Sequence, residues 1–194
     1  SGKSPNFLAI KRGDSNLDAE LAYNIGYDID GSALQVSHNC NGVVNIHGNT
    51  LSGWGRQFFS PSSGGAPLYG LRLESDVHAD LEVTLQNNIF NCTTNDADYT
   101  GSFSPSIGML FVEGAAAENT LATVSHNLFN SSDHDTNQPD GGERFRIGNA
   151  TYTSIDDFIA NEPAYAGNSA NDDPLFVNLV NNNYNLQGGS PAIG

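Results

Sequence analysis

Side chains suited to binding a ligand gather in three stretches of the chain, residues 52–67, 91–106 and 130–143. The first stretch holds Trp54, Arg56, Phe58 and Phe59. An indole close to a guanidinium suits stacking on a sugar ring and bonding to its hydroxyl or carboxylate groups. The alternative is that these aromatic side chains fold back and pack the stretch on itself.

The other two stretches are rich in oxygen ligands. Their candidate metal ligands are Asn95, Asp96, Asp98, Asp133, Asp135 and Asp140. Calcium takes six to eight oxygen ligands, so Ca²⁺ is the cofactor that these stretches would admit, with a solvated acidic loop as the alternative. Neither stretch matches an EF-hand or the glycine-rich calcium-binding repeat. Tyr99 and Arg144 complete the set of candidate ligand contacts.

The three stretches follow equivalent positions of a repeat. Segments 44–51, 83–90 and 122–129 superimpose without gaps at steps of 39 residues. In each segment apolar residues alternate, an asparagine follows, and one more apolar residue comes two positions later, which predicts a strand, a bend and a short second strand. A further alternating segment lies upstream, at 33–36, 70–73 and 109–112, where the first copy needs a shift of two residues.

The recurring asparagines are Asn49, Asn88 and Asn127. Asparagine tolerates a left-handed backbone, and its amide can bond the same amide in the next coil, so we predict an internal asparagine ladder. The alternative is that these amides contact a ligand. Asn149 follows Asn127 by 22 residues, about one coil without an insertion, and is the predicted next rung. The remainder of each 39-residue period would then be a long loop, and all the loops would project from one side.

Parallel stacking of such repeats, at about 4.8 Å per coil, gives one continuous core. We therefore predict an all-β parallel solenoid of four to five coils, in a single domain.

The net charge of −15 disfavours nucleic acid as a partner, and no apolar run is long enough to span a membrane. Cys40 and Cys92 fall at different phases of the repeat, which leaves a disulfide open. His38, His47, His78 and His126 lie on or beside strands, and we interpret them as hydrogen-bonded structural residues.

Three segments near the C-terminus, 145–158, 173–177 and 184–193, together with the central repeats, resemble bacterial right-handed parallel β-helix proteins with a pectin-lyase-like fold. The resemblance covers residues 31–194. It implies a secreted or cell-surface location and one short helix near 154–160. Capping chemistry agrees with that helix, because Thr153 or Ser154 precedes the acidic pair Asp156 and Asp157. Residues 1–30 match no motif and are expected to form an N-terminal coil or cap, and we expect the chain to be truncated at one or both ends.

The family that the chain resembles includes polysaccharide lyases, glycoside hydrolases, carbohydrate-binding proteins and adhesins, so the fold does not name the function. A lyase needs a cation and a basic side chain, which Arg56 and Arg144 could supply. The converging carboxylates of a hydrolase are not visible. We predict a non-catalytic extracellular module that presents loops to a polysaccharide or cell-surface glycan for binding, adhesion or matrix assembly. The alternative is a calcium-assisted polysaccharide lyase.

Overall fold

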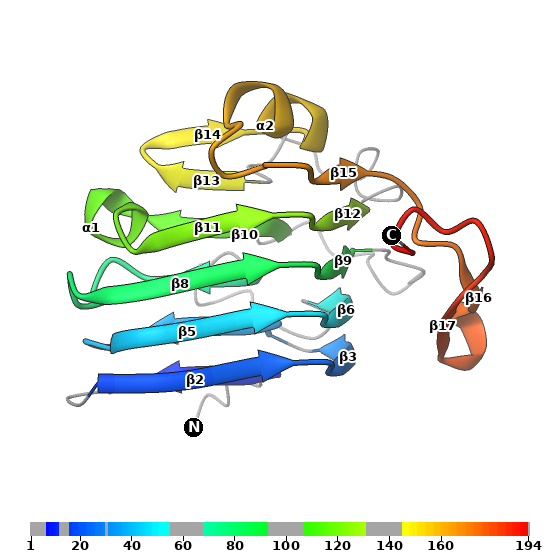
Figure 1. Ribbon diagram of the computed structural model, residues 1–194, viewed down its shortest axis with the longest axis horizontal. Coiled ribbons are helices and arrows are strands. Elements are labelled where there is room, and N and C mark those ends of the chain that lie inside the picture. The colour runs from blue at the N-terminus through cyan, green and yellow to red at the C-terminus, as the bar shows by residue number, and fades with distance from the viewer. Residues whose placement is uncertain are drawn as a thin grey trace, which may run out of the picture.

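The computed structural model describes residues 7–11, 16–29, 31–54, 68–92, 107–130 and 145–193, and most of its strands form three parallel sheets (Figure 1). The first sheet contains β1 (Leu8–Lys11), β4 (Leu34–Ser37), β7 (Leu68–Leu73), β10 (Ile107–Glu113) and β13 (Phe145–Gly148), with β14 (Ala150–Tyr152) antiparallel at its edge. The second sheet contains β2 (Asn16–Ala22), β5 (Asn41–His47), β8 (Leu81–Gln86) and β11 (Leu121–Ser125). The third sheet contains β3 (Ile25–Ile29), β6 (Thr50–Trp54), β9 (Ile89–Asn91), β12 (Leu128–Asn130) and β15 (Ala170–Asn171).

The chain visits the three sheets in the same order on each of its first four passes, and its fifth pass has strands only in the first and third sheets. Within a sheet, each strand pairs in parallel with its counterpart from the next pass, and Figure 1 shows these passes as layers. This arrangement is compatible with the predicted β-helix. Strands β1, β2 and β3 are such a pass, with Asn16 beside Asn41 and Ile25 beside Thr50. The segment for which the sequence offered no motif therefore repeats the pattern of the others.

The predicted spacing is confirmed where the central passes pair. Val44 lies beside Val83 and Leu71 beside Leu110, in both cases 39 residues on. Leu34 lies beside Leu71, which is the expected shift of two residues. A pass without an insertion takes 25 residues, as the pair Asn16 and Asn41 shows, and not the 22 assumed from the sequence.

Inward-facing side chains from all three sheets form one core. Its fully buried members include Ile46, Leu71, Leu85, Phe90 and Phe129. The rings of Phe90 and Phe129 stack with centroids 5.4 Å apart, one pass above the other. Cys40 and Cys92 are buried thiols and not a disulfide. A small domain gains most of its stability from burying such apolar surface, and here each pass buries its share only against its neighbours.

The predicted asparagine ladder is confirmed at the bend between the second and third sheets. The Oδ1 atom of Asn88 accepts from the backbone N–H of Asn49 at 3.1 Å and from its Nδ2 at 2.9 Å. Asn127 accepts from Asn88 in the same way, at 3.1 and 3.0 Å, and Asn49 accepts from Asn24, at 3.0 and 2.9 Å. We call Asn24, Asn49, Asn88 and Asn127 the inner ladder.

The prediction of Asn149 as the next rung is wrong. Phe145–Gly148 pairs with β10 in the first sheet. The ladder lies at the bend that follows the second sheet, so Asn149 is not at a ladder position. The next rung is Ser169, whose Oγ accepts from the backbone N–H of Asn127 at 3.2 Å. A hydroxyl therefore ends the column of amides.

The left-handed residue of each bend is the one before the ladder residue, and not the asparagine itself as predicted. These residues are Tyr23, Gly48, Asn87, His126 and Asn168, with φ between 53° and 64°. Glycine adopts this conformation freely and asparagine tolerates it, whereas it is unfavourable for Tyr23 and His126.

Helix α2 (Ile155–Asn161) confirms the predicted short helix. Ser154 is its N-cap, with Oγ accepting from the N–H of Asp157 at 3.1 Å. Phe158 stacks on Phe145 at 4.2 Å, so the helix covers the last pass of the core. The sequence did not predict α1 (Gly114–Glu118) or the 3₁₀ helix η1 (Leu179–Asn181), because a single turn shows no apolar periodicity.

We expect Asn88→Ala to lower the free energy of unfolding by about 2–4 kcal/mol, because it removes the acceptor of the buried Asn49 backbone N–H and one donor to each of the carbonyls of Ile46 and Gln86. Urea unfolding followed by circular dichroism measures the loss. The control is Asn87→Gly, which changes the neighbouring exposed residue and keeps its positive φ. A loss at position 88 no greater than at position 87 would contradict the structural role of the ladder.

The fold should also lose stability at high pH through Tyr152. Its hydroxyl donates to Glu162, and this bond, with burial and the carboxylate charge, raises the pKa of Tyr152 to about 12. Unfolded tyrosine titrates near pH 10, so the contribution is complete below about pH 10 and disappears as the pH rises toward 12. Unfolding measured between pH 9 and 11.5 should show a steeper decline for the natural chain than for Tyr152→Phe. Parallel declines would show that this bond is not coupled to folding.

Candidate functional site

Most of the residues predicted to bind a ligand or a metal lie outside the described residues. They are Arg56, Phe58, Phe59, Asn95, Asp96, Asp98, Tyr99, Asp133, Asp135, Asp140 and Arg144. Of the ligand-binding candidates, Trp54 alone falls within the part of the chain that the structure describes.

The prediction of Trp54 as a sugar-stacking platform is wrong, because its side chain is completely buried. Its Nε1 donates to the carbonyl oxygen of Gly108 at 3.0 Å, and its ring packs edge-on against Phe90. Trp54 also differs from the alternative, in which the aromatic residues pack the loop on itself, because it is a member of the main core. The sequence interpretation placed the end of the strand too early, since β6 continues from Thr50 to Trp54 and the last residue of the strand belongs to the core.

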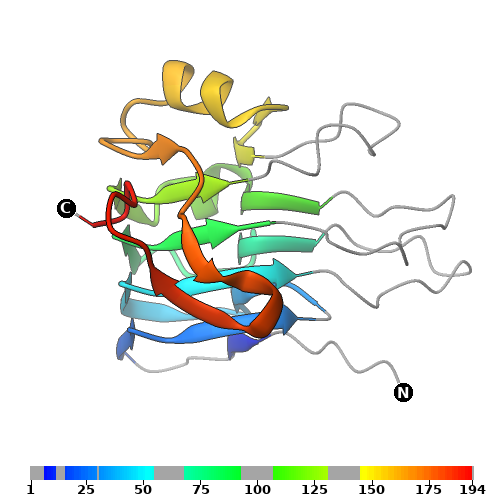
Figure 2. The same cartoon turned by 90° about the vertical axis from the view of Figure 1, so that its right-hand side faces the viewer.

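A C-terminal hairpin of β16 (Phe176–Asn178) and β17 (Asn183–Leu186) folds back across the outer face of the third sheet (Figures 1 and 2). Phe176 packs with Ile89 and Leu128 in a second apolar cluster, separate from the main core. Tyr184 meets Tyr27 of the first pass with ring centroids 5.3 Å apart. The third sheet is thus covered by the core on one face and by the hairpin on the other.

Ser52, Asn91 and Asn130 form a second column of polar side chains on this outer face. The Nδ2 of Asn130 donates to Oδ1 of Asn91 at 2.8 Å, and the Nδ2 of Asn91 donates to Oγ of Ser52 at 3.0 Å. We call these residues the outer column. In the outer column the side-chain amides donate to the preceding pass, whereas in the inner ladder they donate to the asparagine of the next pass. The same 39-residue spacing is visible in the sequence, where these three residues were interpreted as the first residues of loops.

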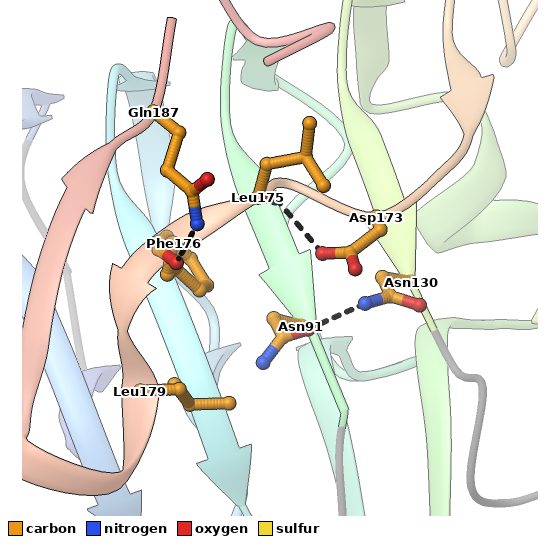
Figure 3. A pocket seen from close by; sticks show the side chains of 7 residues that line it. All are labelled: Asn91, Asn130, Asp173, Leu175, Phe176, Leu179 and Gln187. Carbon is orange, nitrogen blue, oxygen red and sulfur yellow. Dashed lines mark hydrogen bonds between the residues drawn. The ribbon is translucent and has the colours of Figure 1, made fainter. Parts of the chain in front are cut away.

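A pocket of about 210 Å³ lies between the hairpin and the outer column (Figure 3). Its lining residues are Asn91, Asn130, Asp173, Leu175, Phe176, Leu179 and Gln187. Amides from β9 and β12 face a carboxylate and apolar side chains from the C-terminal segment. The sequence missed this pocket because its two walls are separated by 43 or more residues, and only the fold-back of the hairpin brings them together.

Hydrogen bonds fix the hairpin side of this pocket. Asp173 accepts from the N–H of Leu175 through Oδ1 at 2.8 Å, in a turn where Leu175 has a φ of 52°. The Nε2 of Gln187 donates to the carbonyl of Phe176 at 2.8 Å. The second carboxylate oxygen of Asp173 and the carbonyl oxygen of the Gln187 amide remain suited to accept from a ligand.

The part of this lining that the structure describes is suited to binding a small polar group. Among the described lining residues Asp173 is the one ionisable side chain, and the others carry amides or apolar side chains. The volume is below the 300–1,000 Å³ or so of most small-molecule sites, so the pocket fits one ring of a ligand and not a long segment of polymer.

Comparison with protein-family models, with curated proteins and with solved structures finds no significant match. None of the helices in the described residues has the length and apolar content that crossing a bilayer requires.

The burial of Trp54 is directly measurable, because it is the only tryptophan of the chain. We expect the emission of the folded protein to be blue-shifted relative to the urea-unfolded chain, with little quenching by acrylamide. Addition of oligosaccharides should leave this emission unchanged. Emission at the wavelength of the unfolded chain, or strong quenching by acrylamide, would show that Trp54 is exposed and available to stack on a sugar.

Proposed function

We propose that this chain is a right-handed parallel β-helix of the pectin-lyase-like kind, and that it serves as a non-catalytic module on the cell surface or outside the cell. Its partner would be a polysaccharide or a cell-surface glycan. Three parallel sheets visited in one order and an inner asparagine ladder support this architecture. A rigid stack of passes is suited to presenting side chains to a glycan, because each pass holds its outward side chains in register with those of the next.

The pocket under the C-terminal hairpin is the observation that supports glycan binding. A sugar ring offers hydroxyls to polar groups around its edge and C–H groups to apolar side chains on its faces. Asn91, Asn130 and Asp173 supply the polar contacts, while Leu175 and Leu179 supply the apolar ones. β9 and β12 end at the two asparagines, so the pocket also adjoins the start of the stretches that hold the other candidates.

One observation favours the alternative, a calcium-assisted polysaccharide lyase. Arg72 and Arg146 both lie over the ring of Phe111, at 5.7 and 5.3 Å from its centroid. These two guanidinium groups, on the passes before and after that of Phe111, could contact the carboxylates of an acidic polysaccharide. Arg72 also pairs with Glu74 at 3.2 Å, however, and Arg146 donates through Nε to the carbonyl of Gly148, so neither resembles a poised base.

The test of glycan binding compares two tryptophan substitutions on adjacent residues. Leu179→Trp fills the pocket, whereas Val180→Trp places the same side chain on a position that is 83% exposed. On a glycan array, with affinities from titration against the best ligand, we expect at least a tenfold loss for Leu179→Trp and no change for Val180→Trp. Circular dichroism confirms that both variants fold.

Equal binding by the two variants would place the glycan elsewhere, and no binding by the natural chain to any glycan would overturn the proposal. The lyase alternative is tested on the same preparation, with alginate, pectate and glycosaminoglycans in the presence of Ca²⁺. We expect no absorbance from an unsaturated product. Its appearance would show catalysis.

A further inference from the structure

A second cluster of potential ligand atoms lies at the bend between the first and second sheets, away from the hairpin pocket. His38 follows β4, and Glu74 and Asp76 follow β7 in the next pass. One nitrogen or oxygen atom from each of these side chains lies within 4.8 Å of the other two. His38 Nδ1 is 2.8 Å from Oδ2 of Asp76, whose Oδ1 accepts from the N–H of His38 at 2.9 Å.

The stacking of the two passes holds these groups in place. The backbone N–H of Asn39 donates to the carbonyl of Asp76 at 2.7 Å, which joins the two bends directly. Oε1 of Glu74 accepts from Nε2 of Gln35 at 2.7 Å and lies 3.2 Å from Nε of Arg72. The Glu74 side chain is only 16% exposed, so its carboxylate is oriented before any ion arrives. Such supporting contacts are typical of metal ligands in proteins.

An unsatisfied oxygen lies at the same place. Ser37 is fully buried, and among the described residues its Oγ has no hydrogen-bond partner. Side chains alternate along a strand, so Ser37 is on the same face as Gln35, and it directly follows the pair Val36 and Leu73. Continued past Val36 and Leu73, the register puts Ser37 beside Glu74 in the sheet. A buried polar atom without a partner is uncommon, and this one belongs to the residue that directly precedes His38.

We propose that His38, Glu74 and Asp76 form a site for a divalent transition metal ion, with Zn²⁺ as the representative ion. One imidazole nitrogen and two carboxylates match zinc better than calcium or magnesium, which favour sites built from oxygen alone. Zinc–ligand bonds of about 2.0–2.2 Å put neighbouring tetrahedral ligands roughly 3.3–3.5 Å apart. The His38–Asp76 pair needs to open by only about half an ångström, and the ion would replace the direct contact between the two side chains.

The exposure of the site leaves room for further ligands. The His38 and Asp76 side chains are 48% and 47% exposed, so a fourth coordination position would face solvent. This site does not depend on the proposed glycan binding, since it is built from different strands and a different bend. Its role would be to link two passes by an ion, or to offer the open position to a ligand.

The chain contains its own control for this proposal. His47 pairs with Glu20 at 2.8 Å, again between side chains of neighbouring passes, but in the described residues no second carboxylate joins that pair. Non-specific attraction of cations to a chain of net charge −15 acts on both pairs alike. Metal binding at one pair and not at the other would therefore reflect the third ligand.

The experiment uses the full chain without a histidine tag, titrated with ZnCl₂ in excess MgCl₂ by isothermal calorimetry. His38 has a φ of 60°, so His38→Asn is the variant that removes the imidazole and tolerates the backbone. We expect one high-affinity ion per chain for the natural protein and for His47→Asn, and at least a tenfold weaker affinity for His38→Asn and Glu74→Gln. Absorption bands of bound Co²⁺ should disappear in the same two variants.

Thermal unfolding gives a second readout that does not depend on heat of binding. Zn²⁺ should raise the unfolding temperature of the natural chain and of His47→Asn, but not that of His38→Asn. Equal zinc binding by His38→Asn and the natural chain would overturn the proposal. Absence of stoichiometric zinc binding by the natural chain would overturn it as well.

Discussion

The structure depends on amide side chains that are buried at the three central bends between the second and third sheets. Asn49, Asn88 and Asn127 are each at most 2% exposed, and a buried amide without partners costs free energy comparable to that of a core cavity. Asn49 and Asn88 each bond to the asparagine at the same position of the next pass. The Nδ2 atoms of all three amides also donate to a backbone carbonyl of the preceding pass. The register of one pass on the next is therefore fixed by hydrogen bonds, while the apolar core beside the ladder supplies most of the attraction.

Fixed register has consequences on the outside of the stack. Residues at equivalent positions line up whether or not they belong to the core, which is how Ser52, Asn91 and Asn130 form a polar column on the outer face of the third sheet. That column is buried because the C-terminal hairpin packs over it, and the pocket lies where the two do not fill the space between them. At the opposite bend, the same stacking brings His38 of one pass to Glu74 and Asp76 of the next.

The sequence predicted the parallel β architecture and the ladder because both follow from a strict period. A spacing of 39 residues that preserves alternation and one asparagine has few other physical explanations. It could not predict the hairpin pocket, since the fold-back of Phe176 and Leu186 onto Ile89 and Leu128 is a tertiary contact without a local pattern.

Two errors have specific physical causes. Trp54 was expected at the surface because the strand was ended too early, and its burial follows from the length of β6. The cluster of His38, Glu74 and Asp76 was missed because Glu74 and Asp76 follow His38 by 36 and 38 residues. These spacings differ from the 39-residue period of the repeat. Each histidine was interpreted alone, and the interpretation of His38 as a hydrogen-bonded residue is correct as far as its contact with Asp76 goes.

In the folded protein the ladder amides are shielded from solvent between neighbouring passes. Hydrogen exchange of side-chain amides, followed by NMR on a labelled chain, measures this shielding. The Nδ2 hydrogens of Asn49, Asn88 and Asn127 should exchange only through global unfolding, with protection equal to that of the core strands, whereas those of the exposed Asn87 should exchange as in a peptide. Rapid exchange at the three ladder positions, at the rate of Asn87, would contradict the account.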